Sequence, residues 1–215
     1  MQYLPDIVKG EIFKMKKLLL TGFEPFLTNP INPTMDIVKA LDGEVFGEYE
    51  VIGRVLSVDF TKGPEQFKTL LADIKPAMIV SLGLAAGITK ISPERVAINI
   101  KDGEKDNNGV TFEDAPIVEG GEAAYFSTLP IRSMVNRLNE AGYPATISNS
   151  AGTYLCNNMM YEGLRYANLT QNVVAGFIHI PASFELAIAN GRIPGWSSRD
   201  LLNAIKLCLE ECVKN

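Results

Sequence analysis

The chain has 215 residues, of which 47% are hydrophobic and 21% are charged, and its formal net charge is -5 at pH 7. This size fits one large domain or two small ones with a full apolar core, and the mildly acidic charge argues against nucleic acid or an anionic membrane surface as the main partner. The apolar runs are too short to span a membrane, and the start shows no secretory pattern. The chain has only three cysteines, so we expect a cytoplasmic protein with reduced thiols.

The first half of the chain alternates short apolar runs with segments of helical spacing. Residues 16–21 are typical of a buried strand, and residues 33–41 of an amphipathic helix that stops at Asp42-Gly43. A strand over 49–60, a helix over 64–74 that starts with Pro64, and a strand over 77–82 follow. We expect a further strand over 95–100 and a polar surface loop over 101–108.

The second half continues this alternation. The pattern predicts a helix over 131–141, a strand over 145–149, a helix over 153–167, a strand over 173–180 and a closing helix over 197–213. Strands that alternate with helices indicate an α/β layered domain with a largely parallel sheet. We expect a single domain over residues 15–215, with residues 1–14 as an N-terminal extension.

Four unusual loops follow the ends of predicted strands, at residues 22–26, 83–87, 149–152 and 180–181. Ligands of open α/β sheets collect outside the carboxyl ends of the strands, so this topology gathers the four loops at one edge. The glycine-rich loop from Gly83 to Gly87 lacks a complete dinucleotide or Walker pattern, and a tight turn is its simpler interpretation.

Candidate chemistry centres on the only histidine, His179, which ends an apolar strand. Any mechanism that needs an imidazole must use it, although a core histidine bonded to a backbone carbonyl is the alternative. One histidine and scattered cysteines lack the ligand spacing of a zinc site, so we expect no metal. Cys156 lies in the first turn of a predicted helix, where free amides and the helix dipole favour a thiolate and can stabilise an oxyanion. A buried packing role is the alternative for this cysteine.

Other nucleophiles have weaker cases. Cys208 and Cys212 lie four residues apart on the closing helix, and we assign them to packing. Ser150 and Ser183 are rival nucleophiles, but neither lies in a G-x-S-x-G elbow. Glu94 precedes an apolar strand, a place where a carboxylate is usually solvated or paired with a neighbouring arginine.

Six collinear segments together resemble the pyroglutamyl peptidase I family, also called pyrrolidone-carboxylate peptidases, which are cysteine peptidases. They follow the family order and extend from about residue 15 to the end of the chain: LTGFEPF (20–26), NPT (32–34), SPERVAIN (92–99), AYFSTLP (124–130), SNSAGTYLCN (148–157) and GFIHIP (176–181).

The resemblance implies that Cys156 is the nucleophile, His179 the base and Glu94 the third catalytic residue. It implies a phosphorylase/hydrolase-like three-layer α/β/α sandwich with a largely parallel, mixed and twisted sheet. It further implies removal of N-terminal pyroglutamate from peptides through a thioester, with no metal or cofactor, by a homotetramer or dimer.

The resemblance also suggests a pocket for the lactam ring. Its aromatic walls fall on Phe23 and Phe26, and Leu155 and Leu84 line it, with Leu84 in place of a glutamine usual in the family. Asn32 matches a polar position that can bond the lactam amide, although core packing for the phenylalanines and a helix cap for Asn32 are the alternatives. The family's arginine after this glutamine is Ile88 here, and the loop over 102–107 is one residue shorter than usual. These differences leave two other functions open: a cysteine amidase acting on another small N-acyl or cyclic amide, and a non-catalytic small-molecule-binding α/β module.

Overall fold

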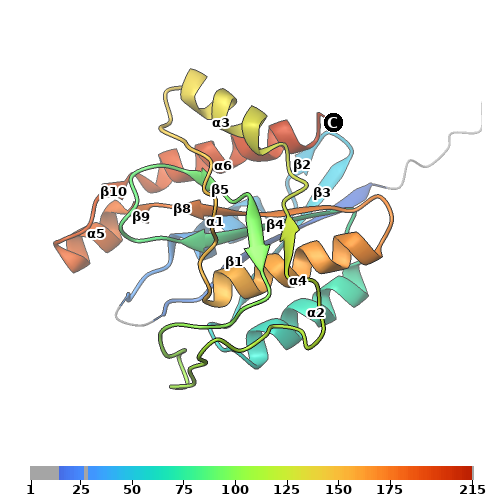
Figure 1. Cartoon of the computed structure of the whole chain (residues 1–215). Coiled ribbons are helices and arrows are strands. Elements are labelled where there is room, and N and C mark those ends of the chain that lie inside the picture. Colours follow the sequence, from blue (N-terminus) through green and yellow to red (C-terminus); the bar gives the residue numbers. More distant parts are fainter. Residues whose placement is uncertain (1–14, 27–28, 215) are drawn as a thin grey trace, which may run out of the picture.

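The computed structural model describes residues 15–26 and 29–214 (Figure 1), so the extension expected over residues 1–14 lies outside the described residues. The strands are β1 (Lys16–Phe23), β2 (Val45–Phe46), β3 (Tyr49–Leu56), β4 (Met78–Leu84), β5 (Ser92–Pro93), β6 (Val96–Ile98), β7 (Ala124–Phe126), β8 (Val174–Ile180), β9 (Ala182–Ser183) and β10 (Gly195–Trp196). The helices are α1 (Pro33–Leu41), α2 (Lys62–Ile74), α3 (Ile131–Glu140), α4 (Leu155–Leu169), α5 (Phe184–Asn190) and α6 (Ser198–Cys212).

A six-stranded sheet in the order β2-β3-β1-β4-β8-β5 forms the centre of the molecule. Its four inner strands, β3, β1, β4 and β8, run parallel, whereas β2 and β5 pair antiparallel at the two edges. Residues 18–23 of β1 and all seven residues of β4 are buried, because a central parallel strand is covered on both faces. The expected largely parallel, mixed sheet is confirmed.

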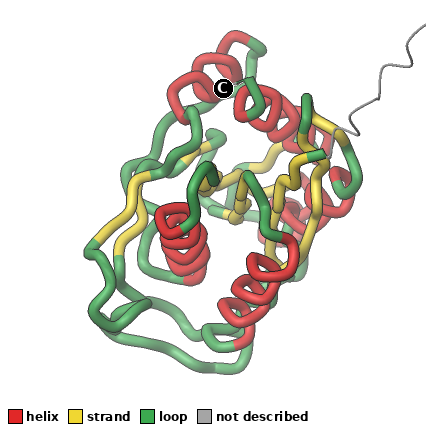
Figure 2. The backbone as a smooth tube through the Cα atoms, turned by 90° about the vertical axis from the view of Figure 1, so that its right-hand side faces the viewer, coloured by secondary structure: helices red, strands yellow, loops and turns green. Residues whose placement is uncertain are grey.

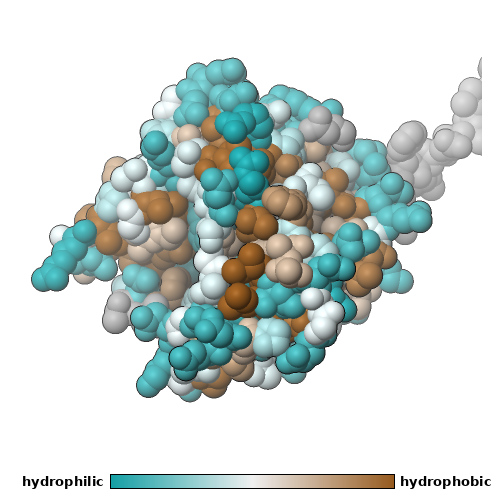
Figure 3. All heavy atoms as spheres, in the orientation of Figure 1, coloured by the Kyte–Doolittle hydropathy of each residue, from teal (hydrophilic) through white to brown (hydrophobic). Residues whose placement is uncertain are grey.

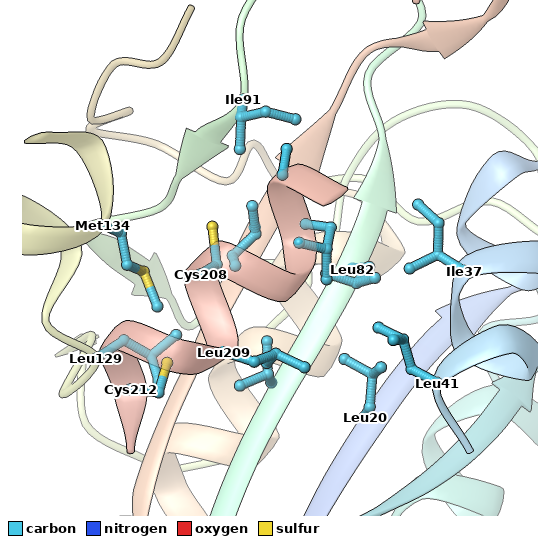
Figure 4. Close-up of a cluster of buried hydrophobic side chains, with 14 of the residues drawn as sticks. Leu20, Ile37, Leu41, Leu82, Ile91, Leu129, Met134, Cys208, Leu209 and Cys212 are labelled. Carbon is cyan, nitrogen blue, oxygen red and sulfur yellow. The ribbon is translucent and has the colours of Figure 1, made fainter. Parts of the chain in front are cut away.

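Helices cover both faces of the sheet, as Figure 2 shows, and this confirms the three-layer α/β/α architecture. One core lies between the sheet and the layer of α1, α3 and α6, and the other between the sheet and the layer of α2 and α4. Cys208 and Cys212 of α6, which the sequence assigned to packing, lie in the first core with Met134, Leu129 and Leu209 (Figure 4). Of the helices in the described residues, none combines the length and the apolar character needed to cross a membrane.

Two predicted strands differ from the structure for local reasons. β3 ends at Leu56 rather than residue 60, because side chains take up the next amides: Glu24 accepts from Val58 N–H at 3.1 Å and Asp106 from Phe60 N–H at 2.9 Å. The strand expected over 145–149 makes only isolated bridges to the segment of β5. Pro93 interrupts that ladder because proline has no N–H to donate.

The helix expected to begin at residue 153 begins at Leu155. Gly152 has a φ of +76° and Tyr154 is extended, so the chain turns before the first helical residue. The shift moves Cys156 to the second position of α4 and keeps it in the first turn, as predicted.

Outside the central sheet, β6 and β7 pair antiparallel and lie beside α4 (Figure 1). Hydrophobic side chains gather in a column over these two strands on the face drawn in Figure 3. Phe126 of β7 is 70% exposed. β6 follows Glu94 in the chain, and Ile98 at its end is hydrogen-bonded to Asn157 near the start of α4.

Candidate active site

His179 and Glu94 form a close pair at the edge of the sheet. His179 is the penultimate residue of β8 and lies opposite Ser92 of β5, and Glu94 follows that strand directly. The distance from His179 Nδ1 to Glu94 Oε1 is 2.6 Å, and only 12% and 2% of their side chains are exposed. This bond fixes the ring and directs the other nitrogen, Nε2, away from the carboxylate. The alternatives of a backbone-bonded histidine and a solvated glutamate are therefore wrong.

Electrostatics in this pair favour a protonated imidazole. Burial by itself lowers the pKa of His179, but the charge and hydrogen bond of Cys156, followed by those of Glu94, outweigh burial and raise the pKa from 6.5 to about 10. Glu94 Oε2 is buried and has no hydrogen-bond partner in the described part of the chain. The carboxylate therefore relies on His179 for its hydrogen bond.

Cys156 comes to the same pair from the start of α4, and its charge and hydrogen bond raise the pKa of the imidazole. Gly83 of β4 lies opposite His179 in the register and leaves room for the thiol. A Cβ atom on Gly83 would lie 2.9 Å from Cys156 Sγ and 2.6 Å from the ring of Phe177. The Phe177 ring in turn packs against that of His179, with centroids 4.9 Å apart. The structure thus brings together all three residues predicted from the sequence.

The start of α4 offers backbone donors beside the thiol. α1 and α6 begin with a side-chain cap, from Asn32 and Ser197, whereas Tyr154 before α4 makes no such hydrogen bond. The first amides of a helix have no partner within the helix. They therefore stay available near Cys156 for a negatively charged oxygen.

A pocket opens directly beside Cys156. It contains all five residues that the sequence suggested for substrate binding, and its lining is Phe23, Phe26, Asn32, Val58, Leu84, Tyr154, Leu155 and Cys156. Seven of these eight side chains are apolar, aromatic or sulfur-containing, and Asn32 contributes the amide. Such a lining suits a small neutral ring better than a charged group.

Comparison with known proteins decides the family. A profile described as pyroglutamyl peptidase matches residues 16–215. The chain belongs to the pyroglutamyl peptidase family. A pyrrolidone-carboxylate peptidase of Lysinibacillus sphaericus is 63% identical over 200 residues, which are 93% of this chain and 98% of that protein. A pyrrolidone-carboxylate peptidase of Pyrococcus furiosus is 46% identical over 200 residues, 90% of this chain and 96% of that protein.

Solved structures of the family agree with the fold. A pyrrolidone carboxyl peptidase from Thermococcus litoralis superposes with a TM-score of 0.89 at 38% identity and covers 93% of this chain and 94% of its own. A mutant of the pyrrolidone carboxyl peptidase from P. furiosus also gives 0.89, at 44% identity and with 93% and 99% coverage.

Within this pyroglutamyl peptidase fold, Asn32 has a structural task. It is fully buried, and its Oδ1 accepts from Thr34 N–H at 3.2 Å and from the Thr34 hydroxyl at 2.8 Å. Its Nδ2 donates to the Glu24 carbonyl at 3.1 Å. The interpretation as a helix cap is therefore confirmed. One N–H of Nδ2 remains for a ligand.

The remaining candidate nucleophiles have other positions. Ser183 caps α5 by accepting from Leu186 N–H at 3.3 Å, and Ser150 accepts from Gly152 N–H at 3.2 Å in an exposed turn. Burial raises the pKa of Cys208 to about 12, in agreement with packing in the core. Within the described residues, no group of three or more His, Cys, Asp or Glu side chains is arranged to hold a metal ion.

Sequence reasoning missed the residues that support the pocket. Tyr154 and Val58 line it, and the Tyr154 hydroxyl donates to the Lys105 carbonyl at 3.1 Å in the loop over 101–111. Asp106, 5% exposed, holds this loop by accepting from the N–H groups of Phe60, Asn108 and Val110, each at 2.9 Å. The one available signal is an acidic residue within a polar turn, and many surface loops share it.

Proposed function

We propose that Cys156, His179 and Glu94 are the catalytic residues with which this chain removes an N-terminal pyroglutamyl residue from peptides. The observation that carries the proposal is the joint position of the buried His179–Glu94 pair and the partly exposed thiol, at the mouth of a pocket with apolar walls. Membership of the pyroglutamyl peptidase family supports the choice of acyl group.

In the resting pair His179 already holds the thiol proton of Cys156, because its raised pKa favours the protonated imidazole. The Cys156 sulfur then forms a bond to the pyroglutamyl carbonyl carbon, and the negative charge moves to the carbonyl oxygen near the first amides of α4. The C–N bond breaks as protonated His179 gives its proton to the leaving amine. The products of this half-reaction are a thioester on Cys156 and the shortened peptide.

Deacylation reverses these roles with water. His179 takes a proton from a water molecule, the hydroxide oxygen bonds to the thioester carbon, and the sulfur leaves as a thiolate. His179 keeps the proton that it took from water, and the resting pair of thiolate and imidazolium is restored. Glu94 holds Nδ1 protonated throughout, so that Nε2 faces the reacting atoms, and it stabilises the imidazolium each time it forms.

The pocket recognises the acyl group. The aromatic side chains of Phe23 and Phe26 and the aliphatic ones of Leu84 and Leu155 provide walls for a neutral five-membered ring. The remaining N–H of Asn32 donates to a lactam oxygen in this assignment. A neutral hydrogen bond contributes about 0.5–1.5 kcal/mol, so shape supplies a large part of the selectivity.

Substitution of the nucleophile tests the proposal. Cys156→Ala eliminates hydrolysis of a pyroglutamyl-arylamide, whereas the matched Cys208→Ala variant, which removes a buried thiol of α6, keeps wild-type kcat. Measurable turnover by Cys156→Ala, at a rate close to that of the wild type, would remove this residue from the mechanism.

A second candidate is a cysteine amidase with a different small acyl group. The observation in its favour is Leu84, which presents an aliphatic wall to the pocket beside Cys156. A panel of arylamides with pyroglutamyl, prolyl, acetyl and cyclopentanecarbonyl groups separates the two candidates. Higher kcat/KM for an acyl group without a lactam supports the amidase.

We also propose that residues 15–215 form one peptidase domain that assembles into a homotetramer in the cytoplasm. One sheet shared by both cores supports the single domain. Phe184 and Ile188, one helical turn apart on α5 and 51% and 82% exposed, support a contact between subunits. Three free cysteines suit a reducing compartment. Light scattering after size-exclusion chromatography gives the assembly mass, and a monomer would contradict the assignment.

A further inference from the structure

We propose that Asn157 is a positioning residue that sets the location of Cys156 relative to the His179–Glu94 pair. This inference rests on the proposed function, because it assigns Asn157 to the same reaction. Asn157 directly follows the candidate nucleophile and is fully buried. Its side chain points toward a different part of the chain from that of Cys156.

The Asn157 side chain is hydrogen-bonded to the end of β6 and the residues after it. Its Oδ1 accepts from Ile98 N–H at 2.9 Å, and its Nδ2 donates to the Ile98 carbonyl at 2.8 Å and to the Ile100 carbonyl at 2.9 Å. One side chain thus satisfies both backbone groups of Ile98, as a neighbouring strand would. All the hydrogen-bonding groups of its amide but one lone pair are used.

Within the described part of the chain, Ile98 lacks a neighbouring strand on the side of Asn157. On the side of β7, Asn99 N–H donates to the Ala123 carbonyl and the Arg95 carbonyl accepts from Ser127 N–H, each at 2.9 Å. Successive residues of a strand direct their backbone groups to opposite edges. Ile98 therefore directs its groups away from β7, toward α4, where Asn157 takes the place of a missing strand.

The segment before β6 begins at Glu94, the candidate acid. Glu94 lies four residues before Ile98, and its N–H donates to the Phe177 carbonyl of β8 at 2.9 Å. The segment from Glu94 to Ile98 is thus bonded to the strand of His179 at one end and to the helix of Cys156 at the other. Asn157 provides the hydrogen bonds that join this segment to the helix.

Contacts on both sides determine where the sulfur lies. On the strand side, Sγ packs against Gly83, which has no side chain there; an added Cβ would lie only 2.9 Å from Sγ. On the helix side, rotation of α4 about its axis would carry Cys156 and Asn157 together. The three hydrogen bonds of Asn157 to β6 and the residues after it oppose that rotation, so they maintain contact between the thiol and His179.

The test compares Asn157→Leu with a matched control, Asn99→Leu. Asn99 makes a similar pair of hydrogen bonds to both backbone groups of one residue: its Oδ1 accepts from Val118 N–H at 2.9 Å, and its Nδ2 donates to the Val118 carbonyl at 2.8 Å. It lies on the same segment but does not bond to α4. Each variant is assayed for kcat, KM, the thermal unfolding midpoint and the rate of iodoacetamide alkylation at Cys156.

We expect both variants to lower the unfolding midpoint. Only Asn157→Leu lowers kcat, by about tenfold to a hundredfold, because a displacement of about 1 Å at the reacting atoms has effects of this size. Alkylation of Cys156 slows in parallel, since the displaced thiol loses contact with the imidazolium. Because Leu155 lines the pocket and moves with α4, KM also rises, but by a smaller factor than kcat falls.

The inference is overturned if Asn157→Leu has the same kcat and the same alkylation rate as Asn99→Leu. Asn157 would then have a purely stabilising role. If Asn157→Leu does not fold, Asn157→Ser is judged by the same criteria, and wild-type kcat in that variant overturns the inference. Cys156→Ala is measured alongside. Activity in that variant refutes the proposed function itself, whereas an inactive Cys156→Ala with an unaffected Asn157 variant refutes only the positioning role.

Discussion

Gly83→Ala adds a single methyl group where β4 passes the Cys156 thiol and the Phe177 ring. The new Cβ would lie 2.9 Å from Cys156 Sγ and 2.6 Å from the ring of Phe177. Non-bonded carbon contacts are most favourable at about 3.5–4.0 Å, so the sulfur and the ring must each withdraw by about 1 Å. Because the Phe177 ring supports His179, the methyl group displaces both members of the reacting pair.

The expected loss of activity follows from this displacement. A misplacement of about 1 Å costs about a hundredfold in rate, which corresponds to about 2.7 kcal/mol of barrier. Overpacking also lowers the free energy of unfolding by about 1–3 kcal/mol. For a chain of this length, each kcal/mol shifts the unfolding midpoint by about 2–4 °C, so we expect a decrease that a thermal melt resolves.

The assay measures kcat/KM on a pyroglutamyl-arylamide together with the unfolding midpoint. Gly87→Ala is the matched control, because it lies four residues further along the same segment and an added Cβ there meets nothing within 4 Å. We expect wild-type kcat/KM from Gly87→Ala. A Gly83→Ala variant within about twofold of the wild type would show that the thiol is not confined as the packing implies.

Three further results follow from the same geometry, and a labelling experiment completes the set. Glu94→Gln removes one of the groups that raise the pKa of His179 to about 10, so the alkaline limb of kcat/KM moves to lower pH; a limb that stays in place contradicts the pairing. In the wild type the raised pKa stabilises the fold fully below pH 6.5, and this contribution disappears as the pH rises through about 10, which denaturant titrations at several pH values detect. Asp106→Ala leaves three amides without their acceptor and loosens the loop beside the pocket, so KM rises more than kcat falls; an unchanged KM would separate the loop from substrate binding. Iodoacetamide near neutral pH labels Cys156 and spares Cys208, because burial raises the pKa of Cys208 to about 12; peptide mass spectrometry after digestion reads the site of labelling.

The order of the main strands and helices could be predicted because each has a strong local pattern. The buried strand β1, the amphipathic helix α1 and the packed cysteines of α6 all have the expected place. The strand expected over 145–149 does not form, because its partner segment contains Pro93, which has no N–H for the ladder. This effect of the proline becomes visible only when the two segments pair. The short strands β2, β5, β9 and β10 have two residues each, too few to produce a period.

The candidate catalytic residues could be predicted because chemistry limits the choice. One histidine and one cysteine at the start of a helix left few combinations, and the family resemblance supplied Glu94. The supporting residues could not be found in the same way. Gly83 matters through the close approach of Cys156 from another element, and Asn157 and Asp106 matter through bonds to backbone groups far along the chain. Such roles depend on tertiary contacts, which a periodicity in the sequence does not express.

The central claim is that the thiol of Cys156 carries the pyroglutamyl group as a thioester. Rapid acid quenching during turnover of a pyroglutamyl-arylamide, followed by peptide mass spectrometry, tests it most directly. We predict one added pyroglutamyl group on the peptide that contains Cys156, absent from Cys156→Ala and released by hydroxylamine. Steady turnover with an unmodified Cys156 at every quench time, or the acyl group on Ser150 or Ser183 instead, would contradict the account.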